Sequence, residues 1–172
     1  MSLSILQQAT NDTYSDFSFQ GLHRVCKVVD IYDADTFRVV FFLQDSDKDP
    51  IKIKVRADGC NACEMFPLKK HKHREEEMKK ARIARNRLLQ LVTNATIDIH
   101  DTGITHNDVE YILSKSTKLV YISFGKFDKY GRVLGTLYES KESTESINIK
   151  LINEKHAIAY YGGKRNKEEL TV

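Results

Sequence analysis

Short apolar runs separated by polar turns occupy the first part of the chain. Two of them, residues 24–31 and 36–43, flank a four-residue polar segment, and the second is rich in Val and Phe, which favour β-strands. A third run follows the polar loop 44–50, and in it apolar and basic residues alternate from Ile51 to Arg56. This period of two predicts a strand with one buried face, and it places Arg56 on the opposite face from the apolar residues.

After residue 74 the apolar spacing changes to three and four residues, which predicts an amphipathic helix over 74–92. The apolar stripe of this helix consists of Met78, Ala81, Ala84, Leu88 and Leu91. The segment 97–100 (IDIH) has the pattern of a strand. A polar excursion over 101–117 follows, which we interpret as either a lid or a plain surface loop.

The last part of the chain returns to strand-like runs. Residues 118–124 and 133–138 predict a hairpin. Ser146 is a suitable N-cap for a short helix over 147–155, and a final apolar piece covers 157–161. The order is three strands, a helix, two or three strands and a terminal helix, which indicates a small closed barrel with helices packed outside it.

Composition restricts the class of protein without selecting a function. A chain of 172 residues is the size of one domain, and its formal net charge of +3 permits contact with a polyanion without demanding it. We expect no membrane contact and no secretory signal, because no long apolar window is present and the N-terminus lacks a basic segment followed by an apolar one. The odd number of cysteines, three, argues against a disulfide framework and favours an intracellular protein, cytoplasmic or nuclear. Residues 1–21 are polar and are expected to form a flexible N-terminal arm.

Three polar segments lie where a barrel would otherwise need only turns. Segment 33–36 joins two predicted strands, 56–64 leaves the third strand, and 128–132 forms the turn of the hairpin. Together they supply oxygen ligands for a hard cation, a spare carboxylate and two guanidinium groups. Phosphodiester hydrolysis uses such a set, since a cation polarises the phosphate, a carboxylate addresses water and arginines bind phosphate oxygens in pairs. A lone Asp-x-Asp at a strand junction is, by itself, more typical of a turn in which Asp bonds to its own backbone.

The order of these segments resembles the staphylococcal nuclease (thermonuclease) family. The chain reads DADTF, VRADGCNACE, DKYGRVLGTLY and finally INIKLINEKHA followed by AYYGGK. The family typically reads D-G-D-T, R-(x)4-D-(A/T)-P-E, D-x-Y-G-R and a short N-x-x-L helix. The resemblance covers about residues 24–165. It implies an α+β, mainly β fold, a five-stranded OB-type barrel with about three packed helices over 22–165, followed by a tail at 166–172.

The resemblance also implies roles for nine residues. The implied catalytic residues are Arg56, Glu64 and Arg132. The implied metal ligands are Asp35, Asn61 and the backbone carbonyl of Ala62. The implied nucleotide contacts are Lys129, Tyr130 and Tyr161. Members of the family hydrolyse DNA and RNA, with single strands favoured, and they use Ca²⁺, so the expected activity is that of a calcium-assisted or other divalent-cation-dependent endonuclease.

The chain departs from the family pattern in ways that keep a second interpretation open. Asn61 stands where the family has its second metal-binding carboxylate, which removes one negative charge from the site. Ala34 replaces a common glycine, and Cys63 replaces the usual proline beside Glu64. The alternative is therefore a catalytically weak or inactive nuclease-like OB-fold module that binds nucleic acid.

Several of the singled-out residues also have plain structural interpretations. Arg56 and Arg132 could belong to a structural ion-pair network, and either tyrosine of the pair 160–161 could stack on a base or pack in the core. The basic run 69–87 is interrupted by glutamates and is expected to be a solvated helix face that could also guide a polyanion. Cys60 and Cys63 could be ordinary thiols, a redox pair, or zinc ligands together with His71 and His73.

Overall fold

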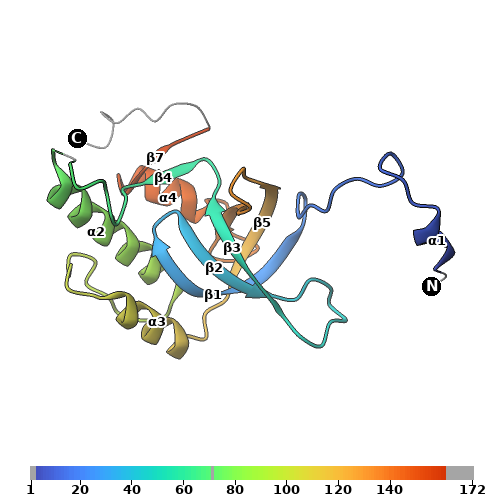
Figure 1. The fold of residues 1–172 in the computed structure, drawn as a ribbon. Coiled ribbons are helices and arrows are strands. Elements are labelled where there is room, and N and C mark those ends of the chain that lie inside the picture. The colour runs from blue at the N-terminus through green and yellow to red at the C-terminus, as the bar shows by residue number, and fades with distance from the viewer. Residues whose placement is uncertain (1–2, 71, 162–172) are drawn as a thin grey trace.

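Five strands close into a barrel in the order β1-β2-β3-β6-β5, and the computed structural model describes residues 3–70 and 72–161 (Figure 1). The barrel strands are β1 (His23–Asp33), β2 (Thr36–Phe41), β3 (Ile51–Ala57), β5 (Val120–Phe127) and β6 (Val133–Tyr138). All neighbouring pairs are antiparallel except β3 and β6, which run parallel and close the barrel. Two short strands, β4 (Cys60–Ala62) and β7 (Ala157–Ala159), form a separate antiparallel pair. The mainly β, OB-type barrel expected from the sequence is confirmed.

The close approach of β3 and β6 requires a glycine. A Cβ atom at Gly135 would lie 2.7 Å from the Cγ1 atom of Val55, which is far too short for two carbon atoms. Gly135 is the partner of Ala57 in the ladder, and Arg56 is the partner of Leu134. The contact therefore places the end of β3, which carries Arg56, beside the start of β6, which Arg132 directly precedes.

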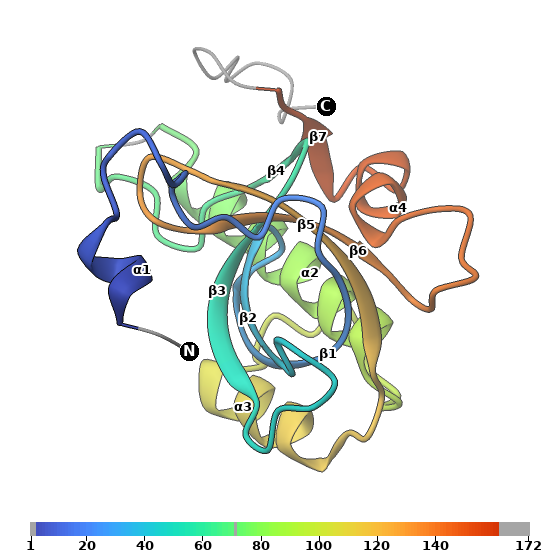
Figure 2. The same ribbon diagram turned by 90° about the vertical axis from the view of Figure 1, so that its right-hand side faces the viewer.

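Three helices pack on the barrel. The helix α2 (Arg74–Val92) contacts β1 and is seen through the opening of the barrel in Figure 2. The helix α3 (His106–Lys115) also contacts β1, and α4 (Ile147–Asn153) contacts β6, α2 and the β4–β7 pair. The predicted apolar stripe of α2 faces the core, with Ala81, Ala84, Leu88 and Leu91 buried. Within the described residues, no helix is both long and apolar enough to cross a membrane.

The segment 97–100 is not a strand, and this sequence prediction was wrong. Its backbone carbonyls accept hydrogen bonds from side chains of α2 rather than from another strand. Asn86 Nδ2 donates to the carbonyl of Ile99 at 3.2 Å, and Gln90 Nε2 donates to that of Ile97 at 3.1 Å. Asn86 is fully buried, so these bonds also satisfy its own amide group.

The segment 101–117 is not a plain loop, because most of it forms α3. Thr105 caps this helix, its side chain accepting from the backbone N–H of Asp108 while the Asp108 carboxylate accepts from the backbone N–H of Thr105. Val109 and Leu113 are buried against the barrel. The signal was present in the sequence as the T-x-x-D capping box followed by apolar residues four apart.

The N-terminal arm is attached to the barrel at its end. Phe19 is 6% exposed and packs against Phe41 and Phe124 at ring-centroid distances of 6.1 and 5.9 Å. The backbone N–H of Gly21 donates to the carbonyl of Phe124 at 3.0 Å. The folded domain therefore begins before residue 22. The helix α1 (Ser4–Gln7) lies away from the barrel (Figure 1).

Candidate active site

One cavity of about 650 Å³ is lined by all nine residues to which the resemblance assigned a role. These are Asp35, Arg56, Asn61, Ala62, Glu64, Lys129, Tyr130, Arg132 and Tyr161. They are spread over more than 100 positions of the chain, and the fold gathers them at one end of the barrel. The convergence agrees with what the sequence led us to expect, whereas the chemical role of each residue stays a prediction.

The barrel topology explains this convergence. The turn between β1 and β2 carries Asp35 and leads to Thr36, which is the ladder partner of Arg56 on β3. The hairpin between β5 and β6 reaches the same place because β6 starts beside the end of β3. The chain then leaves β3 into β4, whose Asn61 pairs with Ile158 on β7 and so brings the end of β7 to the cavity.

Arg56 contacts both Asp35 and Asn61 in the candidate active site. Its Nη1 atom lies 2.9 Å from Asp35 Oδ2 and donates to the carbonyl of Cys60 at 2.7 Å. Its Nη2 atom donates to Asn61 Oδ1 at 2.9 Å. Asp35 Oδ2 also accepts from the backbone N–H of Ala62 at 2.7 Å. Both charged side chains are nearly buried, with 12% of Arg56 and 8% of Asp35 exposed, so this ion pair is shielded from solvent screening.

Asp33 is a second carboxylate of the site, and the sequence analysis gave it no role. Burial and the neighbouring charge of Asp35 raise the pKa of Asp33 to about 8. Asp33 Oδ1 also accepts from the backbone N–H of Asp35 at 3.3 Å, which is the Asx-type turn considered for this Asp-x-Asp segment. The turn and the crowded carboxylates therefore coexist. The spacing Asp33-x-Asp35 around a tight turn was the signal that could have found this residue.

The donor set fits a hard divalent cation. Asp35 Oδ2 and Asn61 Oδ1 both face one cationic group, the Arg56 guanidinium, so these two oxygens already converge on positive charge. Asp33 adds a carboxylate whose pKa is raised by burial first and by the charge of Asp35 second, and a cation would favour its ionised form. Oxygen ligands of carboxylate and amide type are those that Ca²⁺ and Mg²⁺ prefer. Asn61 is the weakest member, because its other atom, Nδ2, is a hydrogen-bond donor with no partner among the described residues.

The β5–β6 hairpin presents Arg132 through a local network. Asp128 Oδ2 accepts from Arg132 Nε at 2.7 Å, and Asp128 Oδ1 accepts from the backbone N–H groups of Tyr130 and Arg132 at 2.9 Å each. These hydrogen bonds outweigh the burial of Asp128 and lower its pKa. The Nζ atom of Lys129 and the guanidinium of Arg132 lie 5.0 and 5.4 Å from the centroid of the Tyr130 ring. Asp128 is thus a positioning residue that orients the turn.

Glu64 and the tyrosines line the open side of the cavity. Glu64 is exposed and lies two residues after the end of β4, three residues after Asn61. Tyr161 is 85% exposed, and a Cβ atom at Gly59 would lie 3.2 Å from its ring, so the tyrosine passes close over that glycine. The backbone N–H of Tyr160 donates to the carbonyl of Gly59 at 3.0 Å. Neither tyrosine of the pair is buried in the core.

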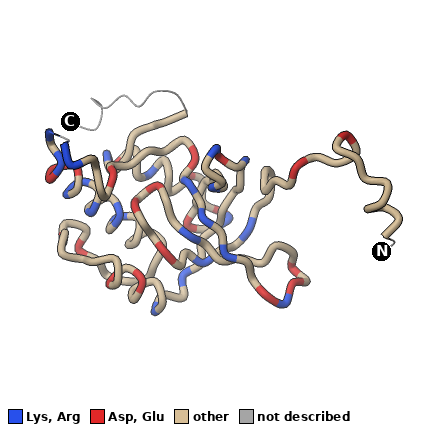
Figure 3. Tube along the Cα trace, in the orientation of Figure 1, with Lys and Arg blue, Asp and Glu red and all other residues tan. Residues whose placement is uncertain are grey.

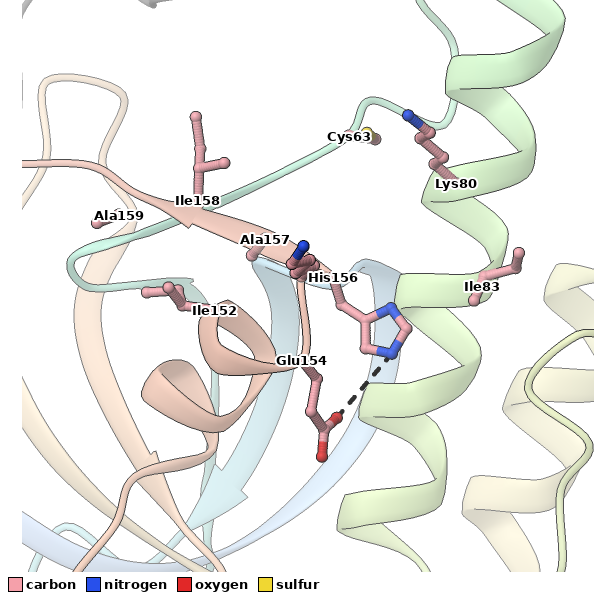
Figure 4. Close-up of a pocket in the computed structure, with 10 residues that line it drawn as sticks. Cys63, Lys80, Ile83, Ile152, Glu154, His156, Ala157, Ile158 and Ala159 are labelled. Carbon is pink, nitrogen blue, oxygen red and sulfur yellow. Dashed lines mark ion pairs between the residues drawn. The ribbon is translucent and has the colours of Figure 1, made fainter. Parts of the chain in front are cut away.

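Cys60 and Cys63 face different cavities. Cys60 lines the candidate active site, whereas Cys63 lines a second cavity of about 570 Å³ on the other side of the β4–β7 pair (Figure 4). Both are free, buried thiols, and burial raises the pKa of Cys60 to about 12. Among the described residues the two cysteines and His73 belong to no group that could hold a metal, and His71 lies outside these residues. A zinc site formed by these residues therefore finds no support.

The second cavity is lined by apolar residues, two lysines and the partly exposed pair of His156 and Glu154. Figure 4 shows His156 directed towards α2, with its Nε2 atom 4.0 Å from Glu154 Oε2. Burial lowers the pKa of His156, and Glu154 opposes this shift. Glu154 is also held by Arg87 of α2 at 2.7 Å, so it bridges the end of α4 and α2. This cluster lies at the second cavity, next to the start of β7.

A further group with metal-ligand chemistry lies at the contact between α3 and β1. His106 Nε2 is 3.5 Å from Asp30 Oδ1 and 3.7 Å from Glu110 Oε1. Asp30 is also paired with Arg38 at 3.4 Å. When His106 is protonated, these contacts are ordinary ion pairs that tie α3 to the barrel.

No protein-family model matches the chain, and no curated protein matches it significantly.

Proposed function

We propose that this protein is a metal-dependent nuclease that hydrolyses phosphodiester bonds of DNA or RNA, with single strands favoured. The observation that carries the proposal is the convergence of two arginines, the aspartates 33 and 35, Glu64, a lysine and two tyrosines on one cavity. The four ordered motifs support a distant relationship to the staphylococcal nuclease family. An intracellular setting is part of the proposal, and three unpaired cysteines are consistent with it.

The phosphate would be bound by Arg56 and Arg132. A guanidinium group presents paired N–H donors that match phosphate oxygens, and its charge stabilises the negative charge gained in the transition state. Asp35 and Asn61 orient Arg56 from one side, and Asp128 orients Arg132 from the other. Lys129 adds a third cation at the rim of the cavity.

Asp33, Asp35, Asn61 and the carbonyl of Ala62 would hold the divalent cation, with Ca²⁺ as the first candidate. A hard cation at such a site supplies Lewis-acid polarisation of the phosphate. Without a cation, Arg56 neutralises Asp35, so the arginine and the cation compete for the same carboxylate.

Glu64 would orient the attacking water and accept its proton. It is an exposed carboxylate that lines the cavity, and it lies close in sequence to the proposed ligands. Tyr130 and Tyr161 are 72% and 85% exposed, which leaves their rings available to stack on a nucleobase.

The proposal is tested by cleavage of a labelled single-stranded oligonucleotide with and without calcium. We expect Glu64→Gln and Arg132→Ala each to lower turnover by about 10²-fold or more, the usual scale for a lost acid–base or charge-stabilising group. Glu75→Gln serves as the control, because Glu75 is 88% exposed on α2 and its loss makes the same change in charge. Cleavage at the wild-type rate by both site variants would discard the mechanism.

A second candidate function is a nuclease-like module that binds nucleic acid without cutting it. The amide of Asn61 favours it, since Asn61 gives the site one negative charge fewer than the carboxylate of the family pattern. The two candidates differ in one measurement. A module binds the oligonucleotide and leaves it intact at every calcium concentration, whereas a nuclease cleaves it.

A further inference from the structure

A row of cations leads along β3 to the candidate active site. Lys52, Lys54 and Arg56 occupy alternate positions of this strand, so all three project from the outer face of the barrel. Lys52 and Lys54 are exposed, and Arg56 lines the active-site cavity. In Figure 3 basic segments recur along this strand. Neighbouring cations in such a row are about 6.6 Å apart, because a strand rises about 3.3 Å per residue.

The neighbours of β3 on both sides add further basic residues to this row of cations. On β2, Arg38 is the direct ladder partner of Lys54, and its side chain is 49% exposed. On the other side, Arg132 directly precedes Val133, which is the ladder partner of Val55. Basic residues therefore flank β3 at Lys54 and at the cavity end of the strand. We call Arg38, Lys52 and Lys54 the β3 basic track.

Several cations elsewhere on the protein are paired with carboxylates. Arg87 is held by Glu154 at 2.7 Å, and Lys118 and Lys150 share Glu139 at 3.2 and 3.0 Å. By contrast, Lys52 and Lys54 have no carboxylate partner in the part of the chain that the structure describes. Lys54 lies directly opposite Arg38, and such like-charge pairs destabilise a sheet, although Asp30 at 3.4 Å from Arg38 offsets part of this repulsion. This arrangement is stabilised when an external polyanion lies across it.

We propose that the β3 basic track binds the sugar-phosphate backbone of a single-stranded nucleic acid whose next phosphate enters the active-site cavity. The proposal rests on the proposed function for the identity of that cavity, but binding by the track requires neither a metal nor cleavage. A single strand fits better than a duplex, because a cavity of about 650 Å³ edged by exposed tyrosines admits a nucleotide and one stacked base. The substrate is then a strand of several nucleotides rather than a mononucleotide or dinucleotide.

The test is a binding measurement in the presence of a chelator, so that neither cleavage nor metal contributes. Fluorescence anisotropy of a labelled 20-nucleotide thymidine strand would be followed over a series of salt concentrations for the double variant Lys52→Gln, Lys54→Gln. The matched control is Lys115→Gln, Lys141→Gln. It removes two exposed charges, one on α3 and one on the loop that leaves the far end of β6.

We expect the track variant to reduce the salt dependence of binding. Each phosphate contact to a single strand contributes about 0.7 to the slope of log K against log salt, so two lost contacts lower the slope by about 1.4 and the affinity near 0.1 M salt by about 10- to 30-fold. The control variant is expected to change the affinity by less than about twofold. A labelled dinucleotide, too short to span the track and the cavity together, is expected to bind both variants equally.

Three results would overturn the proposal. They are an unchanged slope in the track variant, an equal loss in the control variant, and binding of poly-glutamate or of a 20-base-pair duplex as tight as that of the single strand. Failure of the proposed function gives a different pattern. In that case the track variant still loses affinity in chelator, while Glu64→Gln leaves cleavage in calcium unchanged.

Discussion

The crowding of Asp33 against Asp35 predicts an unusual dependence of stability on pH. An unfolded aspartate ionises near pH 4, whereas burial and the charge of Asp35 raise the pKa of Asp33 to about 8 in the folded protein. Between these two pH values the folded state binds one proton that the unfolded state has released. The free energy of unfolding must therefore fall as the pH rises through this range, because the unfolded state binds fewer protons.

The size of the effect follows from the linkage relation. One proton taken up on folding changes the free energy of unfolding by at most about 1.4 kcal/mol per pH unit, or about 2 kcal/mol between pH 6.5 and 8. Asp33 keeps some contact with solvent, which screens its interaction with Asp35, so we expect about 1 to 2 kcal/mol over this interval. The interval avoids His156, whose pKa is lowered by burial and which destabilises the fold only as it becomes protonated at lower pH.

The measurement is urea denaturation in chelator at several pH values from 6.5 to 8. Wild-type protein is expected to lose stability with rising pH, and Asp33→Asn is expected to lose this slope. Asparagine is a suitable replacement because its oxygen can still accept from the backbone N–H of Asp35, as Asp33 Oδ1 does at 3.3 Å. Saturating calcium is expected to flatten the wild-type slope, since a bound cation favours two ionised carboxylates.

Two results would refute this reasoning. Wild-type stability that stays level or rises between pH 6.5 and 8 would show that Asp33 is ionised in the folded protein. An unchanged slope in Asp33→Asn would show that another group takes up the proton. If both of these predictions hold but saturating calcium leaves the wild-type slope unchanged, the two carboxylates interact as described but do not bind calcium.

Two further predictions concern asparagines near the cavity. Asn148→Ala is expected to lower the free energy of unfolding by about 2 to 4 kcal/mol, because it leaves the carbonyl of Asp58 and the buried N–H of Leu137 without the bonds, 2.9 and 3.0 Å long, that Asn148 now makes. Asn153→Ala, which removes an exposed hydrogen bond, is the control in the same urea experiment and is expected to cost less than about 0.5 kcal/mol. Asn61→Asp is expected to raise calcium affinity about tenfold or more in calorimetry, because it adds a carboxylate to the ligand set; unchanged affinity would place the metal elsewhere.

The sequence predicts the barrel strands and two of the three packed helices because their patterns are local. The alternation from Ile51 to Arg56 and the stripe over 74–92 each require only the period of one element. The strand proposed at 97–100 was wrong for a non-local reason. The segment does have an alternating pattern, but its backbone carbonyls accept hydrogen bonds from Asn86 and Gln90 of α2. These partners lie outside any short stretch of sequence around residue 97, so the local pattern could not predict them.

In the candidate site, too, part of the arrangement could be predicted from the sequence and part could not. The motifs identify which residues gather at the cavity, because their order along the chain matches the order of turns at one end of the barrel. What the motifs cannot give is the electrostatic arrangement. The pairing of Arg56 with both Asp35 and Asn61, and the shared burial of Asp33 and Asp35, depend on side-chain positions set by β1, β3 and β4 together.

The Arg56–Asp35 pair bears on both candidate functions. Asp35 Oδ2 accepts from the backbone N–H of Ala62 as well as pairing with Arg56, so the same carboxylate that would bind a cation also fastens β4 to the barrel. A positive charge of the protein itself therefore stabilises this geometry when no cation is bound. It follows that loss of metal affinity through Asn61 need not disrupt the cavity, the arginines or the β3 basic track. We therefore expect that a nuclease and a binding module can share this architecture, and that the charge at position 61 affects metal affinity rather than the stability of the fold.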